Sequence, residues 1–399
     1  MIHFDESMAL LEGLQIKKYK TKKCYLMDTL GYVLAEDIVA KHNSPELPTS
    51  GMDGYAIIYE DQAMGRLKIT SINPAGSTLC SQVIGGTCIK TFTGSLMPEG
   101  ADTLIPIENV EVEGNEIIIK EEVPQGFAVR EVGENYAKGQ KLIEMGTKID
   151  FSHIGVLASL NIVHVLVYEK PIVSILSTGS ELLDLGEVQI NNSQIRSSNN
   201  YTIEAIVKKY DGHPMQLGCV GDDKASIKTV VSDALEKSDI VVTTGGVSVG
   251  DFDFVKDIIY ELECEVIFKG VRVKPGQHIM IARKADKFIV ALPGFAYSAT
   301  VMALVYVVPL IEKLQRGKNP IKQVRAKLKE PFSKRTKKAE FTACNISLIQ
   351  GEYYADFKGK KVGTSAILTN MLGNIGLIFT SENDTSKETG DEVTVLLLD

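Results

Sequence analysis

A glycine-rich segment at residues 243–250 has the composition of an anion-binding loop. It follows the run 239–242, which is short and β-branched, as a buried parallel strand should be. Residues 254–262 then carry apolar side chains at helical spacing. Glycine lets backbone N–H groups approach an anion closely, and a helix N-terminus favours negative charge. The segment therefore predicts either a tight strand-to-helix turn or a cradle for a phosphate group.

Acidic side chains and one lysine occupy other loops of the same region. Glu181 follows the predicted strand 171–176, Asp222 precedes a predicted helix, and Asp253 follows the glycine-rich segment. Carboxylates together with Lys274 and backbone N–H groups suit a phosphate ester bound with Mg²⁺. A purely structural interpretation stays open for each residue. Asp222 could cap its helix, Glu181 could lie on the surface, and Lys274 could be solvated.

Strands and helices alternate across residues 171–317, so these loops belong to strand–loop–helix units. The alternation predicts an open, doubly wound parallel sheet, whose ligand-binding loops lie at the carboxyl ends of the strands. The chain has no GxGxxG after the first strand and no Gly-Lys-Ser/Thr, which argues against a dinucleotide site and a Walker A loop. No histidine except His278 lies at these loop tips, which argues against a serine hydrolase.

The remaining sequence predicts three further parts. Short alternating strands with frequent Gly and Pro indicate a small β domain, which is inserted into an N-terminal domain. In that N-terminal domain we expect helices over 28–34 and 152–160, the second capped by Ser152. The last residues indicate a small β-barrel or sandwich. The predicted domains are 1–42 with 139–170, 43–138, 171–317 and 318–399.

The composition is that of an ordinary globular protein with a formal net charge of −8, which argues against general nucleic-acid binding. The run 318–340 holds nine Lys and Arg against two Glu, and is either a solvated surface or one wall of an anion site. No CxxC pair occurs among six cysteines, as expected of reduced thiols. The apolar stretch 297–311 is interpreted as a buried helix too short to span a bilayer. Because a signal-peptide layout is also lacking, we expect a cytoplasmic protein without membrane contacts.

Motifs spread over almost the whole chain resemble those of one family and occur in that family's order. The family is that of the molybdopterin molybdenumtransferases, the MoeA proteins, which include the gephyrin E domain. The matching motifs are Met52-Asp53-Gly54-Tyr55-Ala56, Thr93-Gly94 with Pro98-Glu99-Gly100, Gly133-Glu134, Ser177-Thr178-Gly179 with Glu181, Gly245-Gly246-Val247-Ser248-Val249-Gly250 with Asp253, Lys274-Pro275-Gly276 and Leu292-Pro293-Gly294.

The resemblance implies an enzyme of molybdenum cofactor biosynthesis. Such enzymes take adenylylated molybdopterin and molybdate, cleave off AMP in the presence of Mg²⁺, and insert the metal into the dithiolene. The implied fold is multidomain, α/β and β, with a doubly wound MogA-like domain, an inserted small β domain, an elongated N-terminal domain with helices and a C-terminal β-barrel domain. The implied assembly is a homodimer whose active site is shared between subunits.

Roles can be carried over where the motifs match. Asp53 and Thr93 would reach in from the partner subunit, although Asp53 could simply form the Asp-Gly turn in which it lies. Lys274 would hold an anion. The residues expected to handle Mg²⁺ and the phosphate or pterin are Glu181, Asp222 and Asp253. The residues expected to bind the substrate are Thr178, Gly179, Gly245, Gly246, Val247, Ser248, Gly250, Pro293, Gly294 and Ser298.

Several positions depart from the family's pattern, and we expect these departures to cluster on the oxyanion side of the site. They are Gln277 and His278 in place of Lys-Pro, Phe295 and Ala296 in place of Asn-Pro, Asn135 in place of Asp, and Ala343 in place of Arg. Two alternatives therefore stay open: a paralogue that uses another oxyanion such as tungstate, and a non-catalytic molybdopterin-binding scaffold. The retained acidic residues favour catalysis, and the extra domains argue against an enzyme of the adenylylation step alone.

Overall fold

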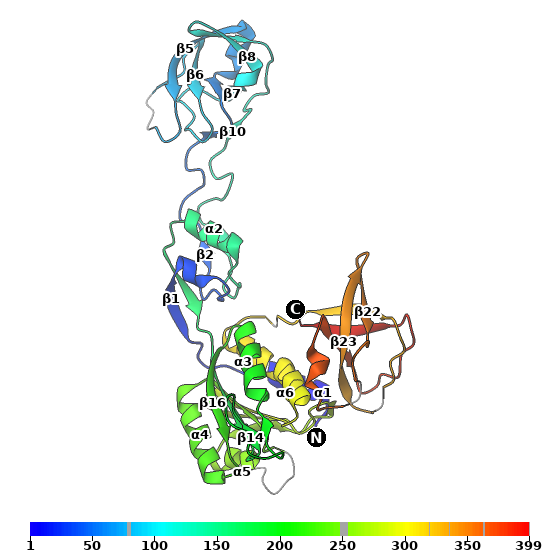
Figure 1. Cartoon of the computed structure of the whole chain (residues 1–399). Helices are drawn as coiled ribbons and strands as arrows, with labels where there is room; N and C mark the ends of the chain where they lie inside the picture. Colours follow the sequence, from blue (N-terminus) through cyan, green and yellow to red (C-terminus); the bar gives the residue numbers. More distant parts are fainter. Residues whose placement is uncertain (78–80, 248–253, 319, 335, 362–363, 399) are drawn as a thin grey trace. The chain divides into compact units, whose positions relative to one another are not determined.

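The computed structural model describes residues 1–77, 81–247, 254–318, 320–334, 336–361 and 364–398. The chain divides into two compact units, whose elements are labelled in Figure 1. The first unit consists of Met1–Ala35, Gly146–Ile154 and His164–Asp399, and the second of Glu36–Met145 and Gly155–Val163. In sequence, the second unit interrupts the first. The finer domain boundaries at 42, 138, 170 and 317 stay a prediction.

A six-stranded sheet forms the α/β part of the first unit. Its strand order is β16-β13-β17-β21-β20-β18. The pairings among the first four strands are parallel, and β20 pairs antiparallel with both β21 and β18. Ile240 and Val242 of β17 enter one core, whereas Val241 between them enters the other. The predicted doubly wound sheet is confirmed, with an antiparallel hairpin at one edge. The strands are β13 (Ile172–Thr178), β16 (His213–Val220), β17 (Ile240–Thr244), β18 (Glu265–Lys269), β20 (Met280–Lys284) and β21 (Lys287–Leu292).

Helices cover both faces of this sheet (Figure 1). One face packs against α4 and α5, and the other against α3 and a long helix that begins at Ala296. The bounds of the shorter helices are α3 (Asn199–Lys209), α4 (Lys224–Lys237) and α5 (Phe254–Glu261). Each helix follows a strand and precedes the next, so the loops between them gather at the sheet's two ends.

The long helix consists of α6 (Ala296–Met302), a π-helical turn η4 (Ala303–Val307) and α7 (Val308–Leu314). Its 19 residues are long and apolar enough to cross a membrane by length and composition alone. The expectation that this segment is too short is therefore wrong, because its hydroxyls do not interrupt the helix. Thr300 Oγ1, for example, donates to the backbone oxygen of Ala296 at 2.8 Å. The buried share of the most apolar window is 83%, which is typical of a core helix.

The C-terminal strands close into the predicted barrel. Successive pairings join β23, β24, β22, β26 and β25, and β25 pairs back with β23. The sequence does not predict β24, a five-residue strand after a turn in which Gln350 and Gly351 both adopt positive φ. The strands are β22 (Gln323–Leu328), β23 (Ala339–Ile349), β24 (Glu352–Asp356), β25 (Ile375–Thr380) and β26 (Glu392–Leu397). The short strand β19 (Val273–Lys274) pairs with β23 in parallel.

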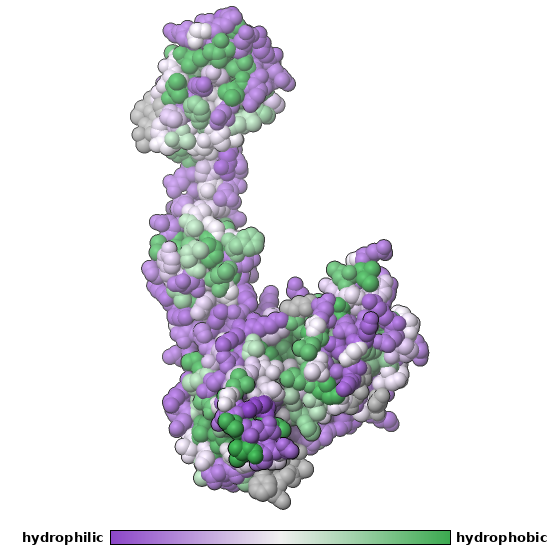
Figure 2. All heavy atoms as spheres, viewed as in Figure 1, coloured by the Kyte–Doolittle hydropathy of each residue, from purple (hydrophilic) through white to green (hydrophobic). Residues whose placement is uncertain are grey.

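The basic run 318–340 forms barrel surface in the part of it that the structure describes. Lys327 pairs with Glu352 at 2.7 Å, and Lys329 lies 3.6 Å from Asp356, with all four side chains partly exposed. Figure 2 shows hydrophilic residues distributed over the visible face of both units. These pairs favour the surface interpretation for Lys327 and Lys329, whereas Ser333 and Glu340 of the same run line a pocket.

Two short elements open the first unit's N-terminal part, namely α1 (Phe4–Glu12) and β1 (Thr21–Tyr25), which pairs with β12 (His164–Tyr168). The helix predicted over 28–34 is wrong. A 3₁₀ turn, η1 (Leu26–Thr29), is followed by Gly31 with φ of +79°, which ends helical geometry. Leu34 then bridges to Val167 and is fully buried.

A helix does form near the second predicted position, α2 (Phe151–Ser159). Its cap is Asp150 rather than Ser152. The Asp150 carboxylate accepts hydrogen bonds from the backbone N–H groups of Ser152 at 2.9 Å and His153 at 3.2 Å. These bonds satisfy orphan donors of the first turn.

The second unit is built on a six-stranded sheet with the order β7-β4-β6-β5-β9-β8. All neighbours are antiparallel except β5 and β6. The predicted small β domain is confirmed. Its main strands are β4 (Gly54–Ile57), β5 (Arg66–Asn73), β6 (Thr87–Thr91), β7 (Thr103–Pro106), β8 (Val110–Glu113) and β9 (Glu116–Ile119).

Candidate active site

A cavity of about 600 Å³ lies at the carboxyl ends of the parallel strands in the first unit. Thr178 ends β13, Thr244 ends β17 and Pro293 follows β21, and all three line the cavity. This is the edge at which an open α/β sheet binds its ligands. Predicted substrate-binding residues that line it are Thr178, Gly179, Gly245, Gly246, Val247, Pro293 and Gly294.

Three glycines of the cavity wall are required by the local backbone. Gly245 has φ of +87°, and a Cβ placed there would lie 2.6 Å from the Thr178 backbone oxygen. Gly246 has φ of +67° and Gly179 has φ of +149°. Only glycine adopts such conformations at low cost, and the wall carries no side chains at these positions. The Gly179 and Gly245 N–H groups donate to the backbone oxygens of Val220 at 3.1 Å and Leu292 at 3.2 Å. The wall is therefore bare backbone that a ligand can approach closely.

Hydroxyl groups behind this wall fix the strand ends to one another. Ser177 Oγ lies 2.8 Å from Thr244 Oγ1 and donates to Asn200 Oδ1 at 2.7 Å. Thr178 Oγ1 contacts the Thr244 backbone oxygen at 3.4 Å. Ser177 and Thr244 are at most 1% exposed. The network holds β13 and β17 in register at the cavity floor.

Two of the three predicted carboxylates line this cavity, Glu181 and Asp222. Asp222 Oδ2 accepts a hydrogen bond from the Ser180 N–H at 2.9 Å, while Ser180 Oγ accepts one from the Asp222 N–H at 2.9 Å. The cap of α4 is instead Asp223, which accepts from the Ser226 N–H at 2.8 Å. The capping alternative for Asp222 is therefore wrong, and its carboxylate faces the cavity loops. Asp253, Ser248 and Gly250 lie outside the described residues, so their roles stay predictions.

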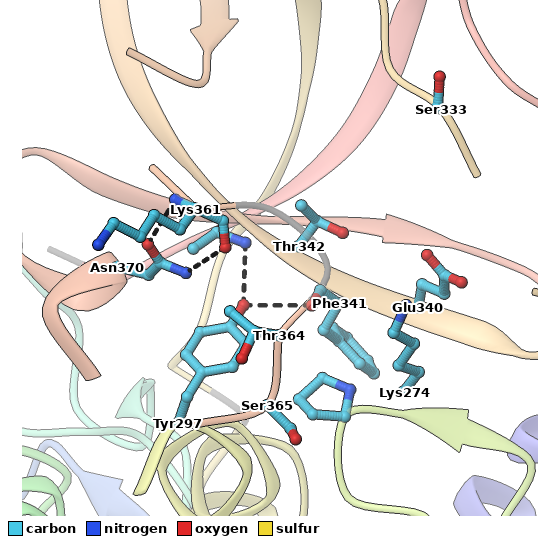
Figure 3. Close-up of a pocket in the computed structure, with 12 residues that line it drawn as sticks. Lys274, Tyr297, Ser333, Glu340, Phe341, Thr342, Lys361, Thr364, Ser365 and Asn370 are labelled. Atoms are coloured by element: carbon cyan, nitrogen blue, oxygen red, sulfur yellow. Dashed lines mark hydrogen bonds between the residues drawn. The ribbon is translucent and has the colours of Figure 1, made fainter. Parts of the chain in front are cut away.

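Lys274 lies elsewhere, in a smaller pocket of about 30 Å³ between the sheet's end and the barrel (Figure 3). In this view Lys274 and Glu340 lie on one side, and Lys361 lies with Asn370 on the other. Ser365 also lines the pocket, and its backbone oxygen accepts from the Ser298 N–H at 3.2 Å. Ser298 itself is 2% exposed and does not line the large cavity. The predicted set thus divides between two pockets.

A buried tyrosine forms the floor of the smaller pocket. The Tyr297 hydroxyl accepts from the Ala343 N–H at 2.9 Å and donates to the Phe341 backbone oxygen at 3.2 Å. These two bonds join the long helix to β23, and both are drawn in Figure 3. Burial raises the pKa of Tyr297 far above its usual value, so the ring stays neutral as a hydrogen-bonding strut.

Asp53 and Thr93 lie in contact with each other in the second unit. Asp53 Oδ1 accepts from the Thr93 backbone N–H at 2.8 Å and from its hydroxyl at 2.7 Å. The Thr93 N–H bond, then its hydroxyl bond, lowers the pKa of Asp53. Gly54 beside it is required by strand pairing, because a Cβ there would lie 2.3 Å from the Ile105 backbone oxygen. The pair presents an ionised carboxylate on a rigid strand end.

Two family models match the chain, "MoeA N-terminal region (domain I and II)" at residues 2–161 and "Probable molybdopterin binding domain" at residues 174–313. The chain is 31% identical to the molybdopterin molybdenumtransferase of Haemophilus influenzae over 301 residues, or 75% of this chain and 74% of that one. The chain belongs to the molybdopterin molybdenumtransferase family. It is also 29% identical to the Bacillus subtilis member over 393 residues, or 96% and 91% of the two chains.

A solved structure of this family has the same fold. The molybdopterin biosynthesis MoeA protein of Pyrococcus horikoshii is 27% identical and matches with a TM-score of 0.84 over 100% of both chains. The resemblance seen in the motifs is therefore confirmed, together with the multidomain fold. The chain is therefore a transferase of the molybdopterin molybdenumtransferase family, which acts in molybdenum cofactor biosynthesis.

The departures from the family's pattern do not form one cluster. Phe295 and His278 line the large cavity, Ala343 lines the smaller pocket, and Asn135 belongs to the second unit. Gln277 Oε1 accepts a hydrogen bond from Lys338 Nζ. The expectation of a single altered oxyanion side is therefore wrong, because His278 and Phe295 line the large cavity whereas Ala343 lines the smaller pocket.

Sequence reasoning misses several cavity residues of this molybdenumtransferase. Arg196 ends the short strand β15 (Ile195–Arg196) and Asn199 begins α3, and neither was expected to contribute. Asn199 Nδ2 donates to the Gly294 backbone oxygen at 2.8 Å and ties two cavity loops together. The available signal is the Ser-Ser-Asn sequence before a helix, which also has the ordinary meaning of a helix start.

Proposed function

We propose that the chain transfers molybdenum from molybdate to adenylylated molybdopterin, with Mg²⁺ present and AMP released. One observation carries this proposal. The large cavity combines a wall of bare glycine backbone with two carboxylates at the carboxyl ends of parallel strands. A wall without side chains lets the phosphate of an adenylylated substrate approach closely, and the volume suits a small-molecule ligand.

The residues of the cavity fit a bound magnesium ion. Glu181 and Asp222 supply hard oxygen donors, and Asp222 uses only Oδ2 for its bond to Ser180. No group of three or more His, Cys, Asp or Glu side chains forms a metal site among the described residues. Mg²⁺ commonly takes one or two carboxylates together with substrate phosphate oxygens and water, so two donors suffice. When bound, the ion supplies positive charge to the phosphoryl oxygens.

We assign the oxyanion to the smaller pocket, where Lys274 and the Ser365 and Thr364 side chains lie. A lysine ammonium attracts a dianion, and hydroxyl groups donate to its oxygens. At an effective dielectric constant of about 20, a unit charge 4 Å away contributes ~4 kcal/mol per unit charge of the anion before screening. Molybdate and tungstate share this charge and shape, so the pocket's chemistry suits either.

We further propose a homodimer in which Asp53 and Thr93 of one copy act at the cavity of the other. The support is chemical: the pair holds an ionised carboxylate, on a unit that is compact in its own right. Size-exclusion chromatography with light scattering tests the assembly. A monomer that retains full turnover would contradict it.

A non-catalytic scaffold is the second candidate, favoured by Ala343 and by Gln277 at positions where the family has cations. One assay separates the candidates. The purified protein is incubated with adenylylated molybdopterin and Mg²⁺, with molybdate, with tungstate or with neither, and AMP is measured. Release that depends on an oxyanion supports the transferase. Its absence with both oxyanions supports the scaffold.

A further inference from the structure

An aromatic side chain stands exposed at the rim of the large cavity. Phe295 lines the cavity and is 63% exposed. Residues 297 to 308 of the helix that follows it are at most 5% exposed. Exposure of so large an apolar ring is unfavourable in water, at roughly 25 cal/mol per Å². A ring kept in that position at a binding cavity is suited to cover a ligand.

The backbone beneath this ring is held firmly. The Phe295 backbone oxygen accepts from the Ala299 N–H at 2.9 Å, in the first turn of the long helix. The backbone oxygen of the preceding residue, Gly294, accepts from Asn199 Nδ2 at 2.8 Å. Gly294 also packs close to Gly245, since an ideal Cβ on Gly294 would lie 3.7 Å from the Gly245 Cα. The ring is therefore attached next to the glycine wall, and its reach into the cavity is set by helix and loop together.

The neighbouring rim is also suited to a flat ligand. Ile195 is 55% exposed, and the half-buried His278 imidazole lines the same cavity. Arg196 is held by a hydrogen bond from Nη1 to the Asp184 backbone oxygen at 2.8 Å. Aromatic, imidazole and guanidinium groups all stack on planar heterocycles. Phosphate at the glycine wall and a ring at the rim would fit one molecule that carries both.

We propose that Phe295 is a specificity-determining residue that stacks against a planar heterocycle of the substrate, whose phosphate lies at the glycine wall. This inference rests on the proposed function, in which the substrate carries two such rings, a pterin and an adenine. Stacking is the chemistry that both share. Phe295 takes no part in bond making, so its removal weakens substrate binding and leaves the maximal rate nearly unchanged.

The absence of tryptophan from the chain makes a direct test possible. In Phe295→Trp, the introduced indole is the protein's sole tryptophan fluorophore. We expect its emission to be quenched, with saturation, by AMP or by a free pterin, and the two titrations identify which ring stacks. The control is Leu348→Trp on β23, which is 62% exposed in the native chain and does not line the cavity. Equal quenching of both variants, or quenching of neither, overturns the proposal.

Binding and turnover supply the second arm. Phe295→Ala should weaken binding of the same ring compound by about 5- to 100-fold, as measured by calorimetry, and Phe295→Tyr should restore it. Because the native ring is mostly exposed, the melting temperature should not fall. Unchanged affinity in Phe295→Ala overturns the proposal even if AMP release is normal. Loss of ring binding in a protein that releases no AMP supports the stacking and contradicts only the proposed reaction.

Discussion

The large cavity and the smaller pocket share one unit of the chain but are constructed differently. The cavity wall is backbone, in which Gly245 is dictated by steric contact with Thr178. The smaller pocket depends on side chains, among them Lys274 and Ser365. A wall of backbone tolerates little change, whereas a pocket of side chains can be retuned one residue at a time. The chain retains the family's glycines at the first site and has Ala343 at the second.

The difference between the backbone wall and the side-chain pocket is tested most strongly by Gly245→Ala. A Cβ there would meet the Thr178 oxygen at 2.6 Å, so Gly245→Ala must shift the cavity wall. We expect AMP release to fall by about 100-fold or more, since a displacement near 1 Å has that effect. Steady-state kinetics measures it.

The matched control is Gly359→Ala. Gly359 also has a positive φ, +77°, but nothing lies within 4 Å of its ideal Cβ. The Gly359→Ala protein should lose about 1–3 kcal/mol in its free energy of unfolding from backbone strain and keep its turnover. Equal losses of turnover in both variants would mean that strain, rather than the cavity wall, explains the effect.

The smaller pocket should respond to Lys274→Ala. Loss of its charge should raise the KM for molybdate by about 10- to 100-fold, after screening of the Coulomb term. The affinity for AMP, which we propose to bind in the other cavity, should not change. Lys327→Ala, which removes a partly exposed ion pair of the barrel, is the control. A parallel loss of AMP affinity in Lys274→Ala would show that the two pockets are one site.

The helix shared by both pockets provides a pH-dependent test. Glu312 is 3% exposed, and burial, partly offset by Lys148, raises its pKa to about 7 from an ordinary 4.5, with Asp211 and Lys170 also nearby. Between these values the folded protein holds a proton that the unfolded chain lacks. The contribution of Glu312 to stability is therefore present below pH 4.5 and lost as the pH rises through about 7, by roughly 1.4 kcal/mol per unit.

Glu312→Gln should remove this dependence. Relative to the native chain, the variant should gain up to about 3 kcal/mol above pH 7, measured by urea unfolding from about pH 5 to about pH 8. Substrate affinity at a fixed pH should not change, because Glu312 lines neither pocket. Parallel stability curves for the two proteins would refute the assigned protonation.

The smallest expected effect separates two neighbouring aspartates. Asp223→Ala removes the cap of α4 and should lower the free energy of unfolding by about 1 kcal/mol, with turnover retained. Asp222→Asn should lower turnover and leave the free energy of unfolding nearly unchanged, because Asp222 lines the cavity. Denaturant unfolding and AMP release, measured on both variants, distinguish the capping role from the role in the cavity. A loss of turnover confined to Asp223→Ala would reverse the assignment.

Much of this arrangement follows from the sequence, because strand and helix periodicities are local. The run at 240–244 and the glycines after it predict both the strand and the cavity wall. The division between two pockets does not follow, since Lys274 ends β19 of the barrel sheet and Pro293 follows β21 of the α/β sheet. The helix predicted over 28–34 fails because Gly31 takes a left-handed conformation that apolar spacing does not reveal. Arg196 lies in a two-residue strand that no sequence pattern predicts.

The central claim is that a nucleotide-and-pterin cavity and a separate oxyanion pocket serve one reaction. The most direct measurement is the rate of AMP release from adenylylated molybdopterin as a function of molybdate concentration, with Mg²⁺ present. The account predicts a saturable rise with molybdate that shifts to higher concentration in Lys274→Ala while the maximal rate is retained. A rate that is the same with and without molybdate would contradict it.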